Sequence, residues 1–190
     1  IDSRLNFSAG ASRQQGLTLL NGAENKTRQH EISGGLRYNY HHGEMLDLSL
    51  SGNISRQQNR FDTGQDQRFI NQRYEAAANL SFLRNYALEL SFGYLRYSSD
   101  PGGFSQEIPL LDLSLSRYVF KNRSGEISLA VDNLLDKDLG VSQQAGANYI
   151  ERSVTESLGR YALLSFTYSL NKQLNPLNNR RKAPMIRLKQ

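Results

Sequence analysis

Few residues in this sequence have the types and spacing that catalysis or metal binding requires. His41, His42 and Glu44 offer three potential metal ligands within a short span. Adjacent residues of a strand point to opposite faces, so only a tight turn would gather them, and we expect no metal site there. No Ser–His–Asp or Cys–His arrangement is present, and no pair of carboxylates stands out for acid and base roles. We therefore expect no enzyme activity and no cofactor.

Two other segments carry residues that could bind a ligand. Residues 100–103, Asp-Pro-Gly-Gly, form a turn signal and lack the lysine of a phosphate-binding loop. The basic segment 172–190 could contact anionic lipid or nucleic acid. We interpret it as a solvated, disordered tail, and we expect no nucleic-acid partner.

The remaining candidates are charged residues that alternate with apolar ones. Two roles are open for them: a hydrogen-bonded, ion-paired interior that keeps a barrel wall rigid, or the lining of a transport path. In both cases they would face the lumen of a barrel. These residues are Arg37, Asp47, Arg73, Glu75, Glu89 and Asp112.

Such a face requires strands, and apolar residues recur at every second position along the chain. The clearest segment sets Leu46, Leu48 and Leu50 against Asp47 and Ser49. Eight segments show this period, near 4–12, 31–40, 46–55, 73–82, 86–94, 106–120, 126–132 and 162–170. The phase breaks around Pro109, where we expect a bulge or an irregular start, because proline cannot donate to the ladder.

Composition places these strands in a membrane. The chain has 38% hydrophobic residues, a mean hydropathy of −0.59 and no cysteine. No run approaches the roughly 18 apolar residues of a transmembrane helix. A barrel strand has low average hydropathy, because only alternate side chains face lipid. Tyrosine and phenylalanine also fall near the expected strand ends, as they do at membrane interfaces.

The connections between strands alternate in length. Long ones are expected at 14–28, 59–68, 98–105 and 137–149, and short ones at 41–43, 84–85 and 121–125. Outer-membrane barrels have short periplasmic turns and long extracellular loops. We therefore expect the long loops outside the cell, where ligand capture would occur.

The final third of the chain resembles a known family. Residues 131–137, Val-Asp-Asn-Leu-Leu-Asp-Lys, and the segment 158–171 are similar to the end of a TonB-dependent receptor, especially the outer-membrane β-barrel family of Bacteroidota. The resemblance implies a barrel of about 22 strands that imports bulky nutrients with energy passed through TonB. This chain would supply the last eight strands, while the N-terminal plug that contacts TonB is absent from it.

The sequence thus predicts an all-β, antiparallel transmembrane barrel segment over 1–171, in the outer membrane and in contact with its lipid. A receptor fragment would have the plug and the remaining barrel strands as partners. One alternative is a free-standing eight-stranded structural or adhesive barrel, since eight strands can close around a side-chain-filled interior. Another is a soluble β-sandwich binding module, in which a second sheet would cover the apolar faces.

Overall fold

Strands make up almost all of the described chain. The computed structural model describes residues 1–20, 23–62, 65–100, 103–137, 139–145, 150–156 and 159–170. No helix long and apolar enough to cross a membrane occurs in these ranges. The strands are β1 (Asp2–Leu20), β2 (Ala23–His42), β3 (Leu46–Phe61), β4 (Gln67–Phe82), β5 (Tyr86–Asp100), β6 (Phe104–Val119), β7 (Gly125–Asp132), β8 (Leu139–Ala145), β9 (Ile150–Glu156) and β10 (Tyr161–Tyr168).

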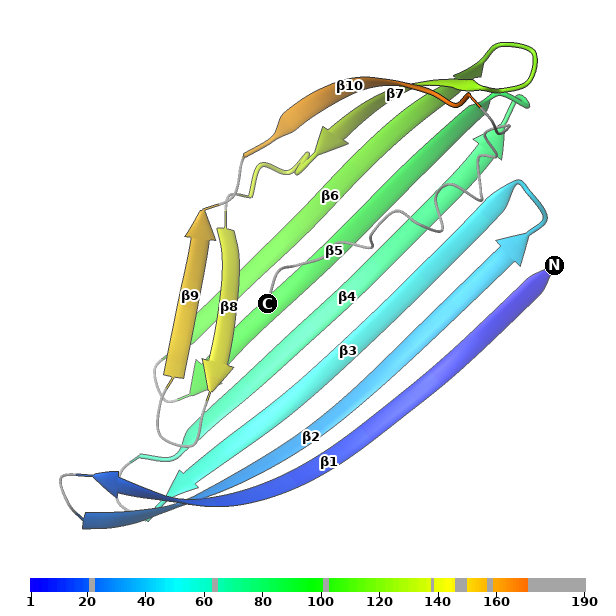
Figure 1. Cartoon of the computed structure of the whole chain (residues 1–190). Coiled ribbons are helices and arrows are strands. Elements are labelled where there is room, and N and C mark those ends of the chain that lie inside the picture. The colour runs from blue at the N-terminus through cyan, green and yellow to red at the C-terminus, as the bar shows by residue number, and fades with distance from the viewer. Residues whose placement is uncertain are drawn as a thin grey trace.

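Eight of these strands form one curved antiparallel sheet (Figure 1). Its order is β1-β2-β3-β4-β5-β6-β7-β10, and β8 and β9 pair separately as a two-stranded hairpin. Every neighbouring pair in the large sheet is antiparallel. The predicted all-β, eight-stranded antiparallel architecture is therefore confirmed.

The two ends of the sheet differ. Tight turns at 43–45, 83–85 and 120–124 lie at one end, which we call the turn end. The β1–β2, β3–β4 and β5–β6 connections lie at the other, the hairpin end, as does the 133–160 segment that holds β8 and β9. The three short connections occur where they were predicted, with bounds shifted by one or two residues.

The predicted long loops are wrong. Strand β1 ends only at Leu20 and β2 already begins at Ala23, so both strands extend into the segment expected as a loop at 14–28. Strand β3 likewise reaches Phe61 and β4 begins at Gln67, inside the expected 59–68 loop, while β8 occupies part of 137–149. These extensions have polar residues on both faces, so the period of two that marks a half-buried strand is missing.

The expected bulge at Pro109 is absent as well. Pro109 lies opposite Tyr94 in an unbroken register, and β6 runs without interruption. The carbonyl of Leu111 accepts a hydrogen bond from the Leu134 N–H, so it points to the β7 side of β6. Residues two apart in a strand direct their backbone groups to the same side, so the nitrogen of Pro109 also points toward β7. Strand β7 pairs with β6 only from Leu113 onward, so the missing N–H of Pro109 removes no ladder bond.

Alternation gives the sheet an apolar face and a polar face. Residues directly opposite each other across antiparallel strands share a face, and one such row is Leu5, Tyr38, Leu50, Ala76, Phe92 and Leu111. Leu50 is 42% exposed and Phe7, one row away, is 76% exposed. No second layer formed by the described residues covers these side chains, which is the arrangement expected of a wall that faces lipid.

Candidate functional site: the polar face of the sheet

The register places all six predicted lumen residues on the polar face. Arg37, Ser51 and Glu75 form one row across β2, β3 and β4. Asp47, Asn79, Glu89 and Ser114 form a second row across β3 to β6. Arg73 and Asp112 stand two positions from members of these rows on β4 and β6, so they point to the same side.

Four of the six residues surround one hollow. The hollow has a volume of about 520 Å³ and is lined by residues of β2 to β7, among them Arg37, Glu75, Glu89 and Asp112. Asp47 lines a neighbouring depression with Asn39 and His41, and Arg73 lines a third depression nearer the hairpin end. The strand pairing thus brings predicted residues as far apart in the sequence as Arg37 and Asp112 into one surface.

Short polar contacts hold this face together. The Ser51 hydroxyl donates to Glu75 Oε2 at 3.1 Å, and the Ser49 hydroxyl donates to Asn39 Oδ1 at 3.0 Å. His41 Nδ1 contacts the Asp47 carboxylate. Each of these contacts joins neighbouring strands, so they stiffen the sheet as well as satisfying polar groups of this face.

The hollow has an acidic balance. Its lining includes one cationic side chain, Arg37, and four carboxylates, those of Glu75, Glu89, Asp112 and Asp132. The predicted set does not include Asp132, although this residue lies on the polar side of its strand. Its position opposite Tyr161 on β10 depends on strand pairing, which the sequence pattern does not give. A concave surface lined by several negatively charged carboxylates attracts cationic groups.

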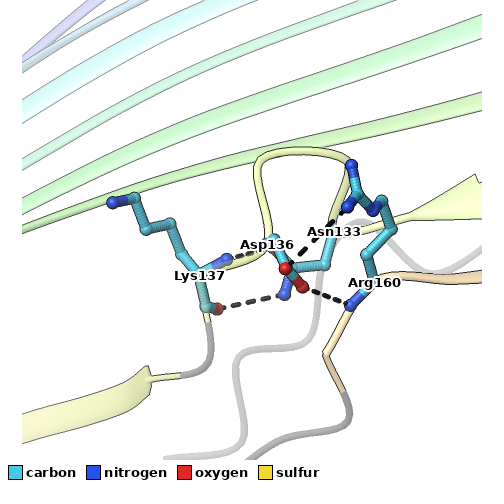
Figure 2. A network of polar contacts seen from close by, with 4 residues as sticks. All are labelled: Asn133, Asp136, Lys137 and Arg160. Carbon is cyan, nitrogen blue, oxygen red and sulfur yellow. Dashed lines mark hydrogen bonds and ion pairs between the residues drawn. The ribbon is translucent and has the colours of Figure 1, made fainter.

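A polar corner closes the hairpin end of β7 (Figure 2). Asn133 Nδ2 donates to the Lys137 carbonyl at 3.1 Å, and the Lys137 N–H donates to Asn133 Oδ1 at 3.0 Å. The Asp136 carboxylate accepts the Arg160 N–H at 2.9 Å and lies 3.9 Å from the Arg160 guanidinium. Asn133 and Asp136 have φ of 52° and 55°, a conformation that Asn and Asp adopt more readily than most residues.

The corner also connects to the hollow. The Asn133 N–H donates to Asp112 Oδ1 at 2.9 Å, so one of the predicted lumen carboxylates receives a backbone hydrogen bond from this segment. Through Arg160 the same segment meets the start of β10. The corner therefore fixes β6, β7 and β10 relative to one another at the hairpin end. The sequence motif at 131–137 lies in this segment, but the sequence did not predict the contacts that Asn133 and Asp136 make.

The other predicted segments contribute less. His41 and His42 lie at the end of β2, and Glu44 lies in the following turn. His41 contacts Asp47, and the ring of His42 stacks on Tyr40, with ring centroids 6.5 Å apart. Within the described ranges no cluster of three or more His, Asp or Glu side chains could hold a metal ion. The predicted basic tail at 172–190 lies outside those ranges.

Long hairpin-connected strands with one apolar and one polar face are typical of the β-barrel proteins of outer membranes. The model of the outer membrane protein beta-barrel family matches residues 6–168 of this sequence. The chain belongs to that family, and its place is the outer membrane, as predicted.

Comparison with solved structures found OmpT, in-vitro folded, an outer membrane protein of Vibrio cholerae. The two share 9% sequence identity with a TM-score of 0.46, and the match covers 88% of this chain. It covers 52% of the OmpT chain, so this chain spans about half of that protein's length. A comparison with curated proteins found no match.

Proposed function

We propose that this chain forms part of the barrel of a TonB-dependent receptor that imports a bulky nutrient, with its polar face lining the transport lumen. The observation that carries the proposal is the open sheet. Strands β1 and β10 are its edges and do not pair with each other. A free strand edge inside a bilayer leaves backbone groups without hydrogen bonds, so each edge needs a partner strand.

The two edges are unequal, which favours partners outside this sheet. Strand β1 has 19 residues and β10 has eight. If they closed on each other, β10 could pair with less than half of β1. Additional barrel strands would satisfy both edges, and they would also widen the lumen, because the diameter of a barrel grows with its number of strands.

The acidic hollow supports a transport role for the polar face. Ser51, Glu75 and Asp112 are tied to neighbouring strands, but the hollow beside them is open. A wider barrel would expose this surface to a passing solute. A free-standing eight-stranded barrel remains the second candidate, and it would pack the same residues against the opposite wall.

Cysteine cross-linking separates the two candidates, and the sequence supplies a background without cysteine. We would place Leu5→Cys on β1 and, in turn, Ser165→Cys, Phe166→Cys and Thr167→Cys on β10, and oxidise whole cells. The positive control is Leu5→Cys with Tyr38→Cys, which lie opposite each other in adjacent strands. We expect a cross-link in the control alone; an efficient β1–β10 cross-link would establish the free-standing barrel.

Import is tested separately from closure. Glu75→Gln, Glu89→Gln and Asp112→Asn together remove three carboxylates from the hollow while preserving side-chain size. The matched control is Glu44→Gln with Glu24→Gln and Asp66→Asn, three described carboxylates outside the residues that line the hollow. We expect nutrient-limited, TonB-dependent growth to fall in the first variant only. Unchanged growth in both would remove the lumen role of the polar face.

A further inference from the structure

A second surface lies on the apolar face, near the hairpin end. Gly34 and Gly52 leave a hollow of about 670 Å³ there, bounded by Leu36, Ile54 and Tyr74. A Cβ atom at Gly34 would meet nothing within 4 Å, whereas one at Gly52 would meet the Tyr74 ring at 3.2 Å. Because these two positions lack side chains, the apolar face of the sheet has a recess there.

Three basic side chains lie on the same face as the recess, two to four positions beyond it toward the hairpin end. Arg13 lies opposite His30, and Arg56 lies diagonally across from His30, because His30 is opposite Gln58. Opposed residues have Cβ atoms about 5 Å apart and diagonal ones about 7–8 Å, so these side chains can reach a common ligand. All three occupy positions on the apolar side of their strands, in line with Leu36 and Ile54.

This trio differs from the other arginines of the hairpin end. Arg28, Arg60, Arg68 and Arg96 each lie within 4 Å of a carboxylate. Among the described residues, Arg13, His30 and Arg56 have no ion-pair partner. The neighbouring positions on the same face also carry no acid group; they are Ala11, Gln15, Ile32, Ile54, Gln58 and Ile70.

We propose that this surface binds a phosphorylated, multi-acylated glycolipid of the outer membrane. Arg13, Arg56 and His30 would hold a lipid phosphate, and one acyl chain would occupy the recess at Gly34 and Gly52. Arginine guanidinium groups bind phosphate through paired hydrogen bonds. The apolar recess continues the lipid-facing surface of the sheet, which is why a membrane lipid suits it better than a soluble anion. The proposal rests on the outer-membrane family and does not depend on the transport role.

The test measures lipid A bound to the protein purified from outer membranes, by native mass spectrometry, with dephosphorylated lipid A as the second probe. We expect Arg13→Gln with Arg56→Gln to weaken lipid A binding about 30-fold, on the basis of each basic residue's typical contribution. Arg84→Gln with Lys121→Gln removes the same charge at the turn end and should have no such effect. Two outcomes would overturn the proposal. In one, the unchanged protein binds lipid A and dephosphorylated lipid A equally well; in the other, the Arg13/Arg56 variant binds lipid A as strongly as its control variant does.

A second variant tests the recess. Gly34→Leu should fill it without a clash and lower binding of both probes, because each needs the space for an acyl chain. Ala78→Leu adds similar volume on the same face, outside the residues that line the recess, and should leave binding unchanged. Heat-modifiable migration confirms folding of every variant. Full binding by Gly34→Leu would exclude the recess as the acyl-chain site.

Discussion

The middle of the sheet and its hairpin end use the same strands but different interactions. In the middle, one face carries apolar residues such as Leu50, Ala76 and Phe92, while the opposite face is polar. At the hairpin end polar residues occur on both faces, although Leu95 and Ile108 are buried on the polar face there. Arginine–carboxylate pairs at 3.5–3.9 Å join the strands to one another and to the β3–β4 connection. A strand can therefore continue past the membrane after its apolar pattern has ended.

The largest effect should follow from placing a charge in the middle region. Leu50→Arg puts a cation on the lipid-facing side of β3 and should destabilise the folded protein by about 2–4 kcal/mol. Gln58→Arg, on the same side of the same strand at the hairpin end, should cost little. The measurement is urea-induced unfolding in lipid vesicles. Equal costs at the two positions would contradict the division of the sheet into these regions.

The polar corner lies where the two regions meet on β7, and its loss should have an intermediate effect. Asn133→Ala removes both hydrogen bonds with Lys137 and places alanine at a positive φ, so we expect a loss of about 2–3 kcal/mol. Asn133→Gly loses the same bonds but tolerates the backbone conformation. It should therefore be the milder variant in the same unfolding assay. The reverse order would show that the backbone conformation is not strained there.

The smallest effects should come from the ion pairs of the hairpin end. Arg96 lies 3.5 Å from Glu107, and both side chains are about half exposed. Arg96→Gln should therefore cost at most about 1 kcal/mol at low salt and nothing measurable in 1 M salt. Unfolding curves at both salt concentrations provide the check. A larger, salt-independent loss would mean that these pairs stabilise the hairpins as strongly as lipid stabilises the middle.

The same contrast explains which parts of the fold could be predicted from sequence. Alternation around Leu46–Leu50 arises because one side faces lipid and the other does not, so the strand centres and the shared face of the charged residues were predictable. Beyond Arg56 the residues Gln57, Gln58 and Asn59 are all polar, so nothing in the sequence indicates that β3 continues. For the same reason the sequence predicts a loop at 137–149, because the residues of β8 include adjacent glutamines.

The candidate site was only partly predictable. Strand alternation assigns Arg37, Glu75 and Asp112 to one face, but it does not say which strands are neighbours. Asp112 meets Asn133 across 21 positions, and Asp136 meets Arg160 across 24. Such contacts depend on strand register and on a left-handed backbone at two residues, neither of which is encoded in a local pattern.

The even number of strands in the large sheet has a consequence for assembly. Strand β1 begins at the turn end and β10 finishes there, since Asp2 lies opposite His41 and Tyr168 lies opposite Gly125. The described sheet thus starts and finishes at the same end. Its connections at the hairpin end are closed hairpins between β1 and β6 and the segment that carries β8 and β9, so this part of the chain can insert through the bilayer as hairpins, two strands at a time.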